Sequence, residues 1–326
     1  MRASGRARLS FLLAAFVLAG CAGPPQERAA SRGSGNGYPV TVSSCGHSST
    51  LRDRPRRAVA LNQGATEIAL ALGVSGQLAG TSYLDNPLPA KWQAAYAKIP
   101  VLAKKYPSKE KLLAGKPDFV YATFSSAYEK DAIGPQSGLD QLGIPSYLSP
   151  FGCAEDRLRG ALSWSTVYEE LTETGKAFGA RDKAEQVIAR QRAEVTALDK
   201  RKPGKGRTAF WYDSGDKAPY AGAGHGGPQL IMSTLGLRNV FADLPGGWAD
   251  ASWEKVVAAD PDVIVLSDAG FSTAQEKIAR LRQDPALRAL EALRHNRFVI
   301  LPFDESMPGV RLAEGAETVA RGLESR

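Results

Sequence analysis

Histidine and cysteine are scarce in this chain of 326 residues, which holds three of each. The histidines, His47, His225 and His295, stand far apart, and none shares the short spacing of a metal-binding motif. A Gly-x-Ser-x-Gly nucleophile elbow is also absent from the sequence. The sequence therefore predicts no metal site, no cofactor and no enzyme activity. A secreted α/β hydrolase of unfamiliar chemistry is the enzyme class that stays as an alternative.

Glycine-rich residues 222–227 (GAGHGG) formally match the Gly-x-Gly-x-x-Gly pattern of dinucleotide sites. Such a site needs the glycines directly after a strand and at the start of a helix. Nine residues separate them from Tyr212, near which the preceding strand is expected to end. The pattern therefore does not favour a dinucleotide site.

Clustered positive charge is missing as well, although the net charge is +7. The densest run, residues 52–57, also contains Asp53 and Pro55. Three arginines and no acids fall within residues 1–20, so removal of that segment lowers the net charge from +7 to +4. A nucleic-acid surface needs a basic patch, and none is indicated.

A long apolar run is found only near the start of the chain. Residues 9–18 are almost wholly apolar and follow three arginines, and the last of them, Leu18, begins the sequence Leu-Ala-Gly-Cys at 18–21. A basic start, a short apolar core and small residues at a cleavage point predict an export signal. The last four residues resemble a bacterial lipobox, which implies lipidation of Cys21 and a cell-membrane lipoprotein on the extracytoplasmic face. An ordinary secretory signal is the alternative.

The segment after this signal has no apolar residue larger than alanine. Residues 22–37 are rich in glycine, proline, serine and charge, so we expect residues 21–37 to be a flexible tether. Cys45 and Cys153 then remain as an even pair in an oxidising compartment, and this favours a disulfide over two free thiols.

Strand and helix patterns alternate through the rest of the chain. Short apolar segments at 58–61, 78–81, 119–123 and 146–148 are separated by helical ones, and the alternation resumes at Thr208. Between them, a helix is expected to end near Phe178 and a longer one to run from Asp182 to about Lys200. The pattern predicts an α/β fold with two lobes, each a largely parallel sheet covered by helices.

An internal repeat links the two halves. Residues 108–120 (SKEKLLAGKPDFV) return 144 positions later as residues 252–264 (SWEKVVAADPDVI), with Ser, Glu, Lys, Ala, Pro and Asp at matching places. In each copy the serine can cap a short helix whose first turn holds a glutamate, Glu110 or Glu254. The repeat predicts one glutamate at an equivalent place on each lobe, as a symmetric partner would require.

These motifs resemble the substrate-binding proteins of iron-siderophore, haem and cobalamin importers. The resemblance rests on residues 57–68 (RAVALNQGATEI), on both repeat segments and on residues 285–299 near the end. It implies two lobes joined by one rigid helix, with Glu110 and Glu254 docking on an ABC permease dimer. The domains expected are a signal peptide at 1–20, the tether, an N-terminal lobe at 38–160, connecting helices at 161–204 and a C-terminal lobe at 205–326.

A ligand cleft is expected between the lobes, at the carboxyl ends of the strands. An aromatic lining with few fixed charges suits a bulky organic molecule or metal chelate. The expected function is delivery of a ferric siderophore or similar chelate to the permease; cobalamin, haem or a deazaflavin-coenzyme precursor are alternatives. The candidate cleft residues are Asn62, Gln63, Tyr83, Phe124, Tyr128, Tyr212, Tyr220, His225, Trp248, Phe303 and Met307.

Overall fold

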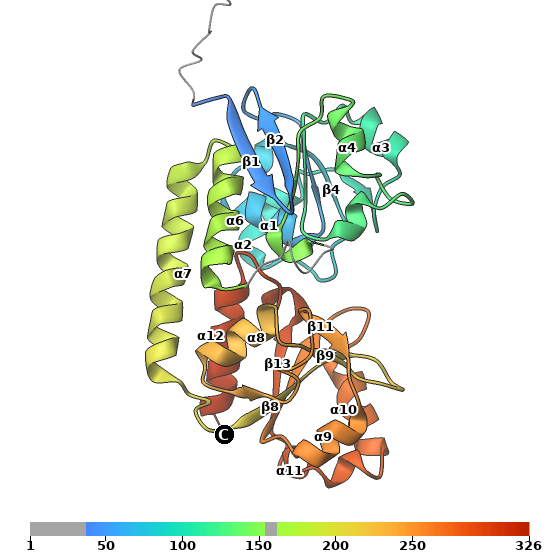
Figure 1. Cartoon of the computed structure of the whole chain (residues 1–326), viewed down its shortest axis with the longest axis vertical. Helices are drawn as coiled ribbons and strands as arrows, with labels where there is room; N and C mark the ends of the chain where they lie inside the picture. The colour runs from blue at the N-terminus through green and yellow to red at the C-terminus, as the bar shows by residue number, and fades with distance from the viewer. Residues whose placement is uncertain (1–36, 154–161, 326) are drawn as a thin grey trace, which may run out of the picture. The chain divides into compact units, whose positions relative to one another are not determined.

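The computed structural model describes residues 37–153 and 162–325 (Figure 1). A hairpin of β1 (Val40–Ser44) and β2 (His47–Leu51) precedes a five-stranded sheet in the order β5-β4-β3-β6-β7, in which all pairings are parallel. This first lobe contains β3 (Ala58–Leu61), β4 (Leu78–Ser82), β5 (Val101–Ala103), β6 (Phe119–Ala122) and β7 (Ser146–Leu148), with α1 (Gln63–Ala71), α2 (Ala90–Tyr96), α3 (Lys109–Ala114) and α4 (Gln136–Asp140).

The second lobe holds a mixed sheet. The parallel members β8, β10, β12 and β13 are extended by the antiparallel strands β9 and β11. Its strands are β8 (Thr208–Ser214), β9 (Tyr220–Gly222), β10 (Arg238–Asn239), β11 (Trp248–Asp250), β12 (Val263–Asp268) and β13 (Phe298–Pro302), and its helices are α8 (Gly227–Thr234), α9 (Trp253–Ala259), α10 (Ala274–Gln283), α11 (Glu291–Arg294) and α12 (Leu312–Glu324).

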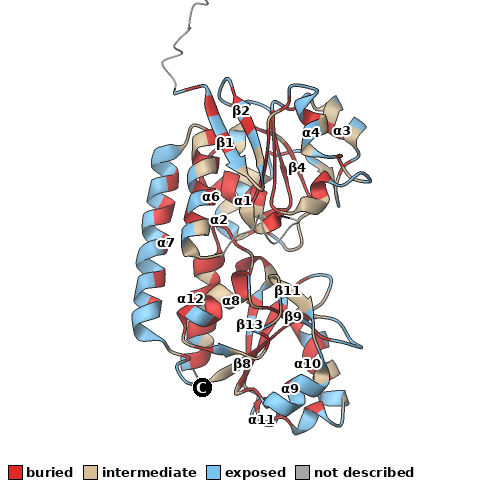
Figure 2. Ribbon diagram, in the orientation of Figure 1, coloured by how far each residue is buried: buried red, intermediate tan, exposed pale blue. Residues whose placement is uncertain are grey.

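Two helices connect the lobes, α6 (Trp164–Ala177) and the longer α7 (Arg181–Arg201). Figure 2 shows α7 buried along one side and exposed along the other, with Val187, Val195 and Leu198 among its buried residues. Its inner side packs on α6 and on α12 of the second lobe. One apolar core therefore extends from Phe119 in the first lobe through α7 to Trp211 in the second.

The repeat segments have the same local structure. Ser108 and Ser252 each accept a hydrogen bond from the backbone N–H three residues on, at Lys111 or Lys255. Each short helix is followed by a residue with positive φ at the ninth repeat position. Each Pro-Asp carboxylate then accepts backbone N–H groups at the start of the lobe's first sheet strand: Asp118 from Arg56 and Arg57, and Asp262 from Thr208.

The strand-helix alternation expected from the sequence is confirmed, with most boundaries within two residues. The second sheet is less parallel than expected, because β9 and β11 form an antiparallel pair at its edge. The lobe boundaries drawn from the sequence stay predictions, and residues 154–161 lie outside the described part. No helix in the described residues is long and apolar enough to cross a membrane.

Candidate functional site

Two adjoining hollows lie where strands of both sheets end, and the larger has a volume of about 210 Å³. They share lining residues, among them Phe124 and Met307, so they are parts of one cleft between the lobes. Lining residues follow β3, β6 and β7 in the first lobe and β13 in the second. This matches the rule that open α/β sheets bind ligands beyond the carboxyl ends of their strands.

Seven of the eleven candidate cleft residues line these hollows. Gln63 and Phe303 line the smaller one, at the floor of the cleft. Phe124 and Met307 belong to both hollows. The larger hollow adds Tyr220, His225 and Trp248 from the second lobe. Whether these residues bind a ligand stays a prediction, but the structure brings them to one place.

Tyr128 and Tyr212 do not line either hollow as described, and their assignment to the cleft is corrected here. Tyr128 is buried in the first lobe, where its hydroxyl donates to the backbone oxygens of Tyr147 and Val120. Tyr212 is buried in the second lobe against Phe210 and Trp253, and its hydroxyl donates to a backbone oxygen three residues on. Tyr212 lies on a covered face of β8, and Tyr128 ends a short 3-10 helix (Ser125–Tyr128), so both rings pack in the core.

Asn62 and Tyr83 support the cleft from behind. The Asn62 amide donates to the Tyr106 hydroxyl, and its side-chain oxygen accepts the backbone N–H of Thr123 at the end of β6. Tyr83 packs edge-on against Tyr106, with 4.8 Å between ring centroids. Neither residue lines the described hollows. The prediction that they belong to the lining is therefore wrong, and they instead pack behind it.

A buried group of charged side chains forms the cleft floor and joins the lobes. Arg311, which precedes α12, lies 3.4 Å from Glu67 of α1 and 2.6 Å from Glu305, and it also pairs closely with Asp304. Burial raises the pKa of Glu67 to about 7, against smaller opposing contributions from the Gln63 hydrogen bond and from Arg311. Burial also raises the pKa of Glu305, so the shared guanidinium does not fully offset the burial of these two carboxyls.

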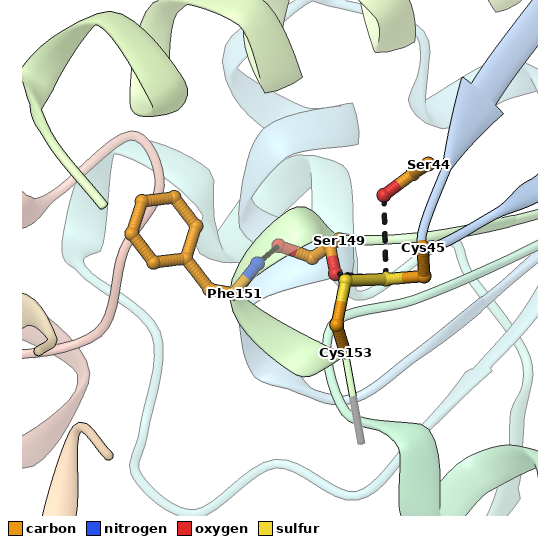
Figure 3. Close-up of a disulfide and its surroundings, with 5 residues drawn as sticks. All are labelled: Ser44, Cys45, Ser149, Phe151 and Cys153. Carbon is orange, nitrogen blue, oxygen red and sulfur yellow. Dashed lines mark hydrogen bonds between the residues drawn. A yellow bond between two sulfur atoms is a disulfide. The ribbon is translucent and has the colours of Figure 1, made fainter. Parts of the chain in front are cut away.

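The structure joins the cysteine pair favoured from the sequence. Cys45, in the β1–β2 turn, and Cys153 form a disulfide with 5.3 Å between their Cα atoms (Figure 3). The bond lies beside Ser149 and Phe151, which line the larger hollow from the segment after β7. It therefore anchors one wall of the cleft to the N-terminal hairpin.

The glycine-rich segment 222–227 has a packing role. It does connect a strand, β9, to a helix, α8, but β9 is antiparallel to its neighbour β8, unlike the strand of a dinucleotide-binding unit. A Cβ atom on Gly224 would lie 2.2 Å from the Ala242 oxygen, and one on Gly227 would lie 1.8 Å from the Ser306 oxygen. Backbone therefore fills the space that a side chain would need.

Glu110 and Glu254 are exposed in the first turns of α3 and α9, away from the cleft lining. Hydrogen bonds from backbone N–H and from Ser108 hold the pKa of Glu110 below its usual range. Cys21 lies outside the described residues. Within residues 37–153 and 162–325, no group of three or more His, Cys, Asp or Glu side chains is arranged to hold a metal ion.

Comparison with known proteins identifies the family. The periplasmic binding protein family matches residues 59–305, which cover most of the chain, nearly all of both sheets and the cleft lining up to Asp304. This chain belongs to that family. It is 25% identical to the uncharacterized ABC transporter substrate-binding lipoprotein YvrC of Bacillus subtilis over 322 residues, 96% of this chain and 95% of that protein. It is 27% identical to the vitamin B12-binding protein of Vibrio parahaemolyticus over 67% of this chain and 73% of that protein.

Solved structures of periplasmic binding proteins share the fold. One from Veillonella parvula is 27% identical, with a TM-score of 0.77 over 88% of this chain and 98% of that chain. A second, of an ABC-type Fe3+-hydroxamate transport system from Saccharomonospora viridis, is 24% identical, with a TM-score of 0.75 over 87% and 99%. This binding protein is thus a substrate-binding component of the ABC importer class, outside the cytoplasm.

Proposed function

We propose that this binding protein is a lipoprotein, anchored through Cys21, that delivers a metal chelate to a two-fold ABC permease. The observation that carries the docking role is the pair of matched helix starts. Each lobe presents an exposed glutamate on a serine-capped helix, held by the same aspartate-to-strand contacts. Neither glutamate forms an ion pair with a described residue, so both are available to cationic sites on a partner.

The cleft favours a bulky chelate over a small polar solute. Large aromatic or apolar side chains stand on both walls among polar ones, with Phe124 on one lobe and Trp248, Phe303 and Met307 on the other. The volume of the larger hollow, about 210 Å³, is smaller than that of pockets that enclose drug-sized ligands. A bulky chelate would therefore be enclosed on one side and would extend through the open mouth on the other. A vitamin B12-binding protein is among the similar proteins, and this supports a bulky chelate as the ligand class.

The docking proposal is tested by separating ligand affinity from uptake. Quenching of Trp248 fluorescence by ferric hydroxamates, ferric catecholates, haem and cobalamin reports binding, because this ring lines the hollow. We expect Glu110→Ala and Glu254→Ala to keep the parent affinity and each to lower uptake, with a larger loss in the double variant. Glu185→Ala, an exposed glutamate on α7, is the matched control and should leave uptake unchanged.

Loss of ligand affinity in the glutamate variants would contradict the docking role. Uptake equal to that of the parent in the double variant would contradict it equally.

A further inference from the structure

The cleft has an unbalanced set of charges. The Asp, Glu, His and Arg side chains in its described lining are Glu67, Asp85, His225, Asp304 and Arg311, beside the phenol of Tyr220. Arg311 is the one guanidinium or ammonium among them, and it is already surrounded by the carboxylates of Glu67, Asp304, Glu305 and Glu314. The described lining therefore offers no spare cation to a carboxylate on a ligand.

Asp85 is the acid in this lining whose carboxylate lacks a partner. It forms no ion pair or side-chain hydrogen bond with a described residue, whereas Glu67 and Asp304 both contact Arg311. The side chain is half-buried beside Gln63 and Phe124 at the cleft floor. An unpaired acid in such a place has a cost in stability that its own lobe does not offset.

The backbone at Asp85 is held firmly from both lobes. Its N–H donates to the Gln63 side-chain oxygen at 2.9 Å, as does the N–H of Asn86. The Asn86 amide reaches the second lobe, where it donates to Asp304 at 2.6 Å and to the backbone oxygen of Asp268 at 3.2 Å. The backbone at Asp85 is therefore held in place, and this restricts the positions that its carboxylate can reach in the cleft.

Burial raises the pKa of Asp85 to about 6, and the nearby charge of Asp213 adds to the rise. The carboxylate is still mostly ionised at neutral pH. A ligand that brings a positive charge or an N–H donor to it would relieve the cost of burial. A ligand that brings another carboxylate would increase that cost.

We infer that Asp85 determines specificity by selecting chelates that present an ammonium or amide donor, and by rejecting chelates that present a carboxylate. This rests on the proposed function and narrows its ligand class to neutral or cationic chelates. An aromatic wall on the second lobe fits the inference. Trp248, Phe303 and the exposed Phe271 form a series with ring centroids 6.2 and 5.4 Å apart, and aromatic faces attract a cationic group on a ligand.

The test uses pairs of probes that differ in one charged group. Ferrioxamine B carries a pendant ammonium, while cyclic ferrioxamine E has the same three hydroxamates without it. Cyanocobalamin carries amides, and its monocarboxylic acid derivative replaces one of them with a carboxylate. Haemin, with two carboxylates, completes the panel. Affinities are measured for the full exported chain and for its Asp85→Asn and Asp131→Asn variants.

In the parent protein we expect ferrioxamine B to bind at least about tenfold more tightly than ferrioxamine E, and cyanocobalamin at least about tenfold more tightly than its monocarboxylic acid, the effect of one charge-assisted hydrogen bond. Asp85→Asn should reduce either ratio to less than about threefold, because the affinity for the ammonium-bearing or amide-bearing probe falls more than the affinity for its counterpart. Asp131→Asn removes an exposed carboxylate outside the cleft lining and should leave the ratio unchanged. The Tm of ligand-free Asp85→Asn should equal or exceed that of the parent, which shows that the variant folds.

A ratio near one in the parent would overturn the inference, as would a ratio that Asp85→Asn leaves unchanged or tighter binding of haemin than of the neutral probes. Those results would leave the proposed function standing, because a chelate still binds. Binding of no probe at all would overturn the proposed function and the inference together.

Discussion

Loss of the Cys45–Cys153 disulfide should destabilise the protein by an amount set by the chain that it closes. The two cysteines are 108 residues apart. In the chain-entropy model, a loop of this length lowers the entropy of the unfolded chain by about 16 cal/mol/K, or about 4.8 kcal/mol at 25 °C. For about 290 folded residues with an unfolding entropy near 2.1 cal/mol/K each, this corresponds to a fall in Tm of about 8 °C.

The perturbation is the Cys45→Ala, Cys153→Ala double variant, measured by calorimetry beside the parent with and without reductant. Reductant should lower the Tm of the parent to nearly that of the variant, and should leave the variant itself unchanged. Ligand affinity should also fall several-fold, because Ser149 and Phe151 line the hollow close to the bond. A Tm loss of less than about 2 °C in both forms would refute the loop-closure reasoning.

Two further predictions concern the cleft floor and the anchor. The folded-state pKa of Glu67 is raised to about 7 from an ordinary value of 4.5, so its ionisation as pH rises through this window costs stability. Glu67→Gln should therefore flatten the fall in Tm between pH 4.5 and 7, and an unchanged slope would count against this. Cells fed labelled palmitate should incorporate label into the parent and none into Cys21→Ser; equal labelling would exclude Cys21 as the lipidated residue.

Local patterns in the sequence were sufficient to predict the helices and strands and their order along the chain. The buried positions of α7, Ala184, Val187, Ile188, Gln191, Val195 and Leu198, are the ones that helical spacing predicts. The capping serines of the repeat were readable because a cap depends on residues within one turn. The export compartment indicated by the first 21 residues also favoured the cysteine pair that the structure joins.

The residues that line the cleft were harder to predict from the sequence, because the direction of each side chain depends on the path of the chain after each strand. Tyr128 and Tyr212 have the composition of ligand-binding aromatics but pack inward. Phe151 and Phe271 were missed, since the first lies in a one-turn 3-10 helix and the second in a turn, and neither belongs to a sequence pattern. Asp85 lies two residues after the candidate Tyr83. In the sequence it looks like any surface acid, and only the structure shows that its carboxylate is half-buried without an ion pair to a described residue.

The sequence by itself determined the fold class, the repeat, the connecting helix and the matched glutamates, because each depends on spacing within a short segment. Tertiary structure alone decided the charge balance of the cleft. Glu67 and Arg311 are 244 residues apart, and their contact exists only because α1 and the start of α12 meet between the lobes. Among the described residues, this meeting surrounds Arg311 with carboxylates and gives Asp85 no ion pair. The difference depends on burial and on distances between remote segments, which no local sequence pattern records.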